Sequence, residues 1–245
     1  MTETILHNRP RVVAIFVVVL AGFVLGQILA TFLDVALVAA TRYPGGVNAL
    51  ANASEPPWWA NVAGLAGLWI GFGAAIYFAR RHVVEPLIRA WSFHRFDAIY
   101  LLLGVALQIG VGLAYAPFHV KNMQGPVNHL FGSAHGVAFI LLATMTVVGA
   151  PVMEEWLFRG VLYRGLEVGL RHRWGRGGSV VAVGASAVVF AAAHAEWLQF
   201  PGLLFLGVVL ALVVRHTQRL LPSALTHVGF NALTMASVMS QRLHH

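Results

Sequence analysis

The chain is a succession of long apolar runs separated by short polar connections. A helix of about 20 apolar residues spans the hydrocarbon core of a bilayer, and several runs approach or exceed that length. The runs cover approximately residues 12–41, 58–79, 98–118, 134–170, 180–195, 202–214 and 221–240. We therefore predict an all-α fold, a polytopic transmembrane helix bundle of seven to eight spans.

The run of residues 134–170 is too long for one simple span. Pro151 lies near its middle, and a proline inside a helix removes one hydrogen bond and crowds the preceding turn. We expect the helix to kink or break at Pro151. A break there would create the eighth span.

The connections between the runs alternate between arginine-rich and arginine-poor. The rich ones carry Arg80, Arg81, Arg89 and Arg95 after the second run, and Arg164, Arg171, Arg173 and Arg176 after the fourth. Because cytoplasmic loops carry an excess of Lys and Arg, the alternation predicts a cytoplasmic N-terminus. With seven spans the C-terminal His245 lies outside. The abundance of Ala, Gly, Val and Arg favours a bacterial source, so we expect the bacterial plasma membrane.

Composition supports a membrane protein and removes other classes. The 245 residues are 58% hydrophobic and 10% charged, whereas about 25% of a soluble domain is charged. The net charge of +7 could suggest nucleic acid, but the arginines lie at the ends of apolar runs, so we expect a lipid bilayer as partner and no nucleic acid. The absence of cysteine excludes disulfides, cysteine nucleophiles and thiolate metal sites.

Ionisable side chains at membrane depth cost at least ~2.5 kcal/mol each, so they mark sites of interest. In "EEWLFR", Glu155 and Arg159 are four residues apart and can pair on one helical face. Glu154 is rotated by about 100° from Glu155 and is free for chemistry. The alternative is a buried ion-pair network that only fixes helix packing. Asp34, inside the first run, is either functional or a structural hydrogen-bonding group.

Two further polar groups lie on later runs, His194 in "FAAAH" and the pair His227 and Asn231 in "HVGFN". Each alone is typical of hydrogen bonding between helices. Together with Glu154 they place a carboxylate, two imidazoles and an amide on three spans, which are the parts of a water-activating hydrolase. At 1.5 Å rise per residue, Glu154 and Asn231 both lie about 15 Å from the ends of their spans.

These residues resemble the CPBP family, the CAAX proteases and bacteriocin-processing enzymes that are also called the Abi family. The family carries EExxxR, FxxxH and HxxxN in this order, and the chain has "EEWLFR", "FAAAH" and "HVGFN". The resemblance covers about residues 140–240. We therefore divide the chain into N-terminal transmembrane helices without an assigned motif, residues 1–130, and a catalytic transmembrane region, residues 131–245.

The resemblance implies intramembrane hydrolysis of a peptide bond in a membrane-associated or membrane-inserted protein or peptide. In the family, the positions of Glu154 and His194 activate water, and those of His227 and Asn231 stabilise the oxyanion. Glu155 and Arg159 would have supporting roles. No cofactor is favoured.

Two alternatives stay open. Glu154, His194 and His227 could hold a zinc ion, because one carboxylate and two histidines form a familiar catalytic zinc set, although the chain has no HExxH motif. The polar groups could also belong to a transporter or membrane scaffold that binds a solute or partner without hydrolysis.

Overall fold

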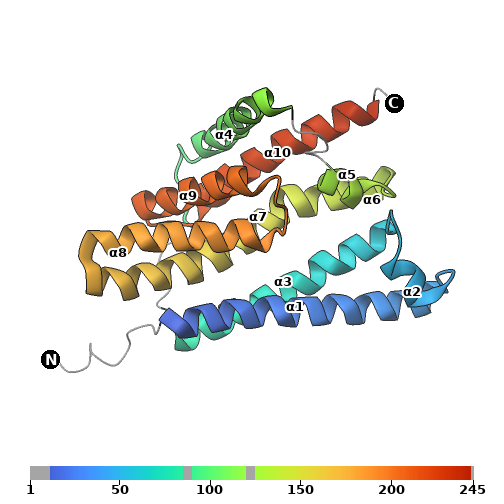
Figure 1. Cartoon of the computed structure of the whole chain (residues 1–245), viewed down its shortest axis with the longest axis horizontal. Coiled ribbons are helices and arrows are strands. Elements are labelled where there is room, and N and C mark those ends of the chain that lie inside the picture. The colour runs from blue at the N-terminus through green and yellow to red at the C-terminus, as the bar shows by residue number, and fades with distance from the viewer. Residues whose placement is uncertain (1–11, 85–89, 120–124, 244–245) are drawn as a thin grey trace.

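The computed structural model describes residues 12–84, 90–119 and 125–243, and these ranges contain helices and turns without a strand (Figure 1). The predicted all-α class is therefore confirmed. Several residues behind the predicted orientation, among them Arg89 and His245, lie outside the described residues.

Among the residues that the structure describes, five helices are long and apolar enough to cross a membrane: Val12–Thr41, Trp58–His82, Ile99–Phe118, Gly136–Ala193 and Phe200–Thr217. The fourth has 58 residues and folds back on itself at Gly175, whose backbone angles, φ 55° and ψ −131°, are not helical. Figure 1 shows the resulting hairpin within α8. The chain thus has membrane-spanning helices, and the number of seven to eight spans stays a prediction.

The helix was expected to kink or break at Pro151, and it continues through this residue without a break. It runs as α6 (Gly136–Thr144), the π-helical η3 (Met145–Gly149), α7 (Ala150–Glu154), the π-helical η4 (Glu155–Tyr163) and α8 (Arg164–Ala193). A π turn shifts the hydrogen-bond register by one residue, which accommodates the missing donor and the ring of a proline. The break that would have produced an eighth span at Pro151 is therefore absent.

The first layer of the bundle is the antiparallel pair of α1 (Val12–Thr41) and α3 (Trp58–His82), joined through α2 (Gly46–Ala51). Glycines let the two backbones touch: a Cβ atom added to Gly71 would lie 2.3 Å from the carbonyl oxygen of Gly22. Small residues at such a contact allow close van der Waals packing between membrane helices.

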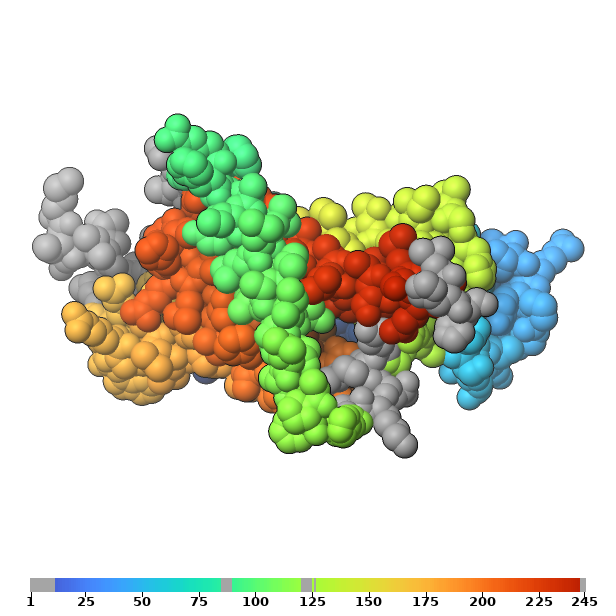
Figure 2. Space-filling model, turned by 90° about the horizontal axis from the view of Figure 1, so that it is seen from above, coloured from blue at the N-terminus to red at the C-terminus, as the bar shows by residue number. Residues whose placement is uncertain are grey.

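The second layer pairs α4 (Ile99–Tyr115) with α10 (Leu221–Leu243), and Figure 2 shows α4, in green, lying across α10 at the surface. A Cβ atom added to Gly104 would lie 1.9 Å from the carbonyl oxygen of Thr226, so glycine is required at this crossing. The short helices η2 (Ala116–Phe118) and α5 (Gly125–Phe131) follow α4.

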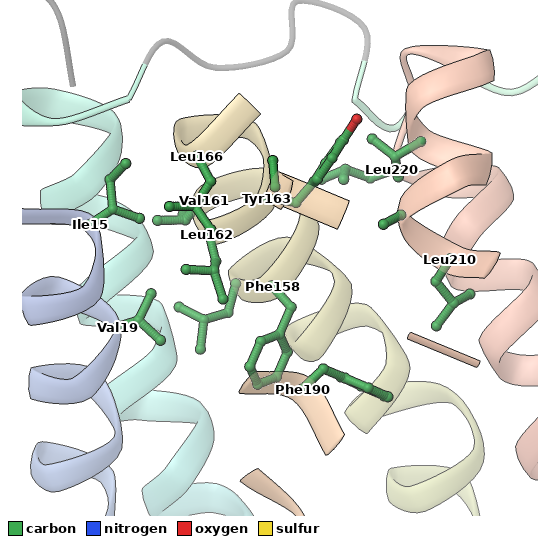
Figure 3. Packing of buried hydrophobic residues seen from close by; sticks show 14 of the residues in the cluster. Ile15, Val19, Phe158, Val161, Leu162, Tyr163, Leu166, Phe190, Leu210 and Leu220 are labelled. Carbon is green, nitrogen blue, oxygen red and sulfur yellow. The ribbon is translucent and has the colours of Figure 1, made fainter. Parts of the chain in front are cut away.

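The core lies where η4 and α8 meet α1 and α9 (Phe200–Thr217). Figure 3 shows its centre, in which Phe158 packs against Phe190, with their ring centroids 5.3 Å apart. Ile15 and Val19 close this cluster from α1, and Leu210 closes it from α9. Because the apolar faces of η4 and α8 are held on both sides, the positions of the polar side chains on these two helices depend on this packing.

A buried ion pair ties the segment before α4 to the turn between α9 and α10. Arg219 donates to both carboxylate oxygens of Asp97, at 2.6 and 2.8 Å, and to the carbonyl oxygen of Ser92 at 2.9 Å. The backbone N–H of Leu220 donates to the carbonyl oxygen of Ala90 at 2.7 Å. The hydrogen bonds from Arg219 lower the pKa of the Asp97 carboxyl below its usual value.

We predict that Asp97→Asn lowers the free energy of unfolding by about 3–5 kcal/mol near neutral pH, because it leaves Arg219 buried without its charge partner. Since the pKa of Asp97 is lowered in the folded state, the pair stabilises the protein above about pH 4, and this contribution disappears as the pH falls through the folded-state pKa. The stability difference between the two proteins should therefore shrink below about pH 4. Thermal unfolding in detergent with Asp97→Asn, Arg219→Gln and the double variant measures the coupling, and additive single effects would contradict the prediction.

Candidate active site

Glu155 is the most deeply buried carboxylate of the motif region and is held from three sides. Arg159 Nη1 donates to its Oε1 at 2.8 Å, and the Ser223 hydroxyl donates to its Oε2. The Nδ1 atom of His227 lies 3.3 Å from Oε1. Arg159 also donates to the carbonyl oxygen of Gly207 at 3.2 Å. The predicted pair of Glu155 and Arg159 is thus present, and it joins η4 to α9 and α10.

Phe190 supports both imidazoles and the guanidinium. The Arg159 guanidinium lies 4.3 Å from the centroid of the Phe190 ring, a cation–π distance. The ring also packs edge-on against His194 and His227, with centroids 4.8 and 5.6 Å away. Its carbonyl oxygen accepts a hydrogen bond from His194 Nδ1 at 2.8 Å. The phenylalanine of the second motif therefore contacts the guanidinium of Arg159 and the imidazoles of His194 and His227.

Glu154 lies between the two imidazoles. Its Oε2 atom is 3.9 Å from His194 Nε2 and 3.8 Å from His227 Nε2, beyond direct hydrogen-bonding distance. This oxygen is buried and has no hydrogen-bond partner among the described residues. An unsatisfied buried acceptor is costly, so the space between Glu154 and the imidazoles suits a small polar ligand.

The partners of the two Nδ1 atoms decide what the Nε2 atoms can do. A carbonyl or carboxylate oxygen can only accept, so Nδ1 of each histidine carries the proton. Nε2 of a neutral His194 therefore presents a lone pair toward Glu154. The His194 side chain is 29% exposed and that of Glu154 is 18% exposed, whereas His227 is 2% exposed. The first two side chains are thus open to a reactant, and His227 is enclosed between two carboxylates.

The same donors fit a zinc ion in chemistry but not in spacing. Imidazoles whose Nδ1 atoms are fixed by a carbonyl or a carboxylate are typical zinc ligands. Zinc–ligand distances of about 2.0–2.2 Å put neighbouring ligand atoms roughly 3.3–3.5 Å apart, closer than the 3.8 and 3.9 Å found here. No group of three or more His, Cys, Asp or Glu side chains in the described ranges has the spacing of a metal site.

Asn231 lies one turn beyond His227 on α10, where its Nδ2 donates to the carbonyl oxygen of Thr146 at 3.1 Å. Thr146 belongs to the π-helical η3, so this bond links α10 to the helix that carries Glu154. One of the two amide hydrogens of Asn231 is used in this way.

Asp34 lies on α1, which carries none of the three motifs, and its buried Oδ1 has no hydrogen-bond partner among the described residues.

Ser223 contacts the buried Glu155, a contact that was not predicted from the sequence although a signal existed. It precedes His227 by four residues, so both project from one face of α10 toward Glu155. Thr146 and Gly207 also contribute, but they do so through backbone carbonyl oxygens. A pattern of side chains cannot reveal such contacts.

A cavity of about 360 Å³ opens beside the third motif, between α4, α9 and α10. Phe230 and Thr234 line it from α10, on either side of Asn231 in sequence. Gln108 lines it from α4, and its Oε1 is buried without a hydrogen-bond partner among the described residues. Tyr115 also lines the cavity, and its hydroxyl donates to the carbonyl oxygen of Leu198 at 2.9 Å. The cavity therefore offers polar groups beside the helix that carries Asn231.

The chain was compared with protein-family models, with curated proteins and with solved structures, and one family model matches part of it. The searches for similar curated proteins and for similar solved structures found no match. A family model described as "Type II CAAX prenyl endopeptidase Rce1-like" matches residues 136–233, a range that contains all three motifs. The predicted resemblance to the CPBP and CAAX proteases is thus confirmed. Over residues 136–233 the chain is similar to the Rce1-like family of type II CAAX prenyl endopeptidases, which supports a membrane protease.

Proposed function

We propose that the protein is an intramembrane endopeptidase in which Glu154 and His194 activate a water molecule that attacks a peptide bond of a membrane-associated or membrane-inserted substrate. The observation that carries the proposal is the convergence of Glu154 Oε2 with the Nε2 atoms of His194 and His227 at 3.8–3.9 Å. A water placed between Glu154 and His194 can donate one hydrogen to each lone pair. Such a water is oriented and ready to lose a proton.

Glu154 acts as the general base. It takes a proton from the water as the oxygen attacks the carbonyl carbon of the scissile bond, and the same proton then passes to the leaving amine nitrogen. His194 holds the second hydrogen of the water. The lack of any other partner for Glu154 Oε2 supports this assignment, because the oxygen is not committed to a structural bond.

His227 and Asn231 stabilise the oxyanion. His227 Nε2 lies 3.8 Å from Glu154 Oε2, so it faces the space in which the proposed water attacks and the oxyanion forms. The amide of Asn231 has a second hydrogen beyond the one bonded to Thr146, and it is available to the same oxyanion.

Glu155 and Arg159 support the site without touching the reactants. The carboxylate fixes the Nδ1 side of His227, and Arg159 fixes the carboxylate.

The zinc alternative requires a lone pair on Nε2 of both His194 and His227, because each Nε2 would bind the metal ion. A zinc ion held by Glu154, His194 and His227 would supply Lewis-acid activation of the water. A non-hydrolytic transporter or scaffold is the alternative from another class.

We further propose that the N-terminus is cytoplasmic in a bacterial plasma membrane. Figure 1 shows that the end of α3, with Arg80 and Arg81, and the hairpin of α8, with Arg171 and Arg173, lie at the same end of the bundle. Basic residues gathered at one end follow the positive-inside rule. Seven spans, with the hairpin of α8 counted as two, remain part of this proposal.

Substitution of the base tests the chemistry. Glu154→Gln keeps the shape of the side chain and removes the base, so we expect near-complete loss of cleavage of a farnesylated CAAX-type peptide or of unmodified transmembrane peptides in detergent. His194→Ala should behave likewise, with normal thermal unfolding in both. Asn231→Ala should keep residual activity, because loss of one oxyanion donor costs roughly 10²–10³ in rate. A fully active Glu154→Gln protein would exclude Glu154 as the base.

Chelation separates the water mechanism from zinc in the same assay. The proposed mechanism predicts that activity survives a strong chelator. About one zinc per chain, lost from His194→Ala and His227→Ala, together with activity that a chelator removes and zinc restores, would overturn the metal-free mechanism and keep the protease assignment. Cleavage by neither the parent nor any variant would instead favour the transporter or scaffold.

A second experiment separates the supporting pair from the reacting groups. Glu155→Gln and Arg159→Met should each lower the free energy of unfolding by about 3–5 kcal/mol, because each leaves a buried charge without its partner. Thermal unfolding and protein yield measure this effect. Glu196→Gln and Arg171→Met, which alter residues outside the cluster, are the matched controls and should be neutral. Parent-like stability of both test variants would show that the pair has no structural role.

Orientation is tested by cysteine labelling, since the chain has no cysteine of its own. A cysteine at Gly177, an exposed position in the hairpin of α8 where an added Cβ atom meets nothing within 4 Å, should react with a membrane-impermeant maleimide only after the cells are opened. A cysteine at Ser54, in the connection between α2 and α3, should react in intact cells. The reverse pattern would invert the proposed orientation.

A further inference from the structure

A second hollow lies on the other side of the catalytic helix, between α3 and the junction of α7 and η4. This groove has a volume of about 420 Å³. Its lining residues are Gly73, Ile76, Tyr77, Arg80, Arg81, Met153 and Trp156. Apolar and aromatic side chains form one end of the groove, and two arginines form the other.

Aromatic rings hold both arginines at the groove. The Arg80 guanidinium lies 5.7 Å from the centroid of Trp156, and that of Arg81 lies 4.9 Å from the centroid of Tyr77. Both distances are within the range of cation–π attraction. No carboxylate of the described residues pairs with either arginine. Within residues 12–84, 90–119 and 125–243, two positive charges are therefore presented together without an anionic partner.

The position along α3 matches the level of lipid headgroups. The membrane-spanning helix Trp58–His82 ends directly after Arg80 and Arg81. Gly73 and Ile76 lie about 10 and 6 Å deeper along the same helix, at 1.5 Å per residue. The groove thus runs from charged groups at the membrane surface into the apolar region, as a phospholipid does.

The groove is separate from the catalytic residues. Trp156 contacts Arg80 of α3 and packs edge-on against Trp91, with ring centroids 5.8 Å apart. Glu154, two residues earlier, faces His194 and His227. The two faces of the helix therefore carry different groups, and the groove does not depend on the proposed proteolysis.

We propose that this groove binds an anionic phospholipid. Arg80 and Arg81 hold the phosphate, and the upper part of one acyl chain lies along Ile76 and the open space at Gly73. Arginine forms directional hydrogen bonds to phosphate oxygens, and basic pockets between membrane helices recognise anionic headgroups. A bound lipid bridges α3 and η4, so it links the N-terminal helices to the helix that carries Glu154.

Thermal unfolding of the purified full-length protein in a neutral detergent tests the site. Added phosphatidylglycerol should raise the unfolding midpoint by several degrees in a saturable way, because a ligand of the folded state stabilises it. Phosphatidylcholine with the same acyl chains should give a much smaller shift. Glycerol phosphate, which has the charged group without acyl chains, should give none. Equal shifts from both lipids, or a full shift from glycerol phosphate, would overturn the proposal.

Paired variants localise the effect. Arg80→Gln with Arg81→Gln should weaken the apparent affinity for phosphatidylglycerol by roughly tenfold or more, because it removes both charges of the site. Arg171→Gln with Arg173→Gln removes two exposed arginines of the α8 hairpin and is the control for net charge. An undiminished response of the groove variant, or an equal loss in the control, would contradict the proposal.

The acyl half of the site has its own test. No atom outside the local helix lies within 4 Å of a Cβ added at Gly73, so Gly73→Leu fills the groove without a clash. Gly64 on the same helix is equally open and lies outside the groove, so Gly64→Leu is the matched control. Gly73→Leu alone should lose the phosphatidylglycerol shift. Glu154→Gln should keep it, so a failed protease assignment and a failed lipid site give different results.

Discussion

The buried carboxylate of Glu155 is the interaction on which the rest of the site depends. Its side chain has no exposed surface, and it accepts hydrogen bonds from Arg159, Ser223 and His227. A charge at this depth is tolerated only when such partners satisfy it. Since the partners come from η4 and α10, and Arg159 reaches on to α9, the need to satisfy one carboxylate brings three helices into register.

The hydrogen bonds that satisfy Glu155 leave the Oε2 atom of Glu154 without a hydrogen-bond partner among the described residues. Its neighbour Glu155 takes the available donors on one face, and Glu154 faces two imidazoles whose other nitrogens are already committed. A buried ion pair is weak evidence for net stability, because desolvation offsets much of the attraction. Its contribution here is position: Glu155 holds His227, and the ring of Phe190 packs against both His194 and His227.

The two faces of the helix that carries Glu154 meet different neighbours. One face carries Glu154 toward the imidazoles, and the other carries Trp156 toward the arginines at the end of α3. The π-helical turns on either side of α7 set this division, because each changes the register of the helix by one residue. Pro151 lies between them, and the helix remains continuous through it.

The sequence alone was sufficient for properties that depend on local periodicity. Apolar runs of membrane length predicted the all-α membrane fold, and spacing by four residues predicted the pair of Glu155 and Arg159. The three ordered motifs indicated the family. These inferences succeed because helix geometry relates neighbours in the chain in a fixed way.

The tertiary structure decided what depends on contact between helices. The bond from Ser223 to Glu155, the bond from Asn231 to Thr146 and the clamp of Asp97 by Arg219 each join residues 68 or more positions apart. Only the structure could show that the helix is continuous through Pro151, because π turns in so short a segment do not change the apolar pattern of the sequence recognisably. Packing of helix faces selects one arrangement among many that the same apolar pattern allows, so only the folded chain shows which polar groups meet.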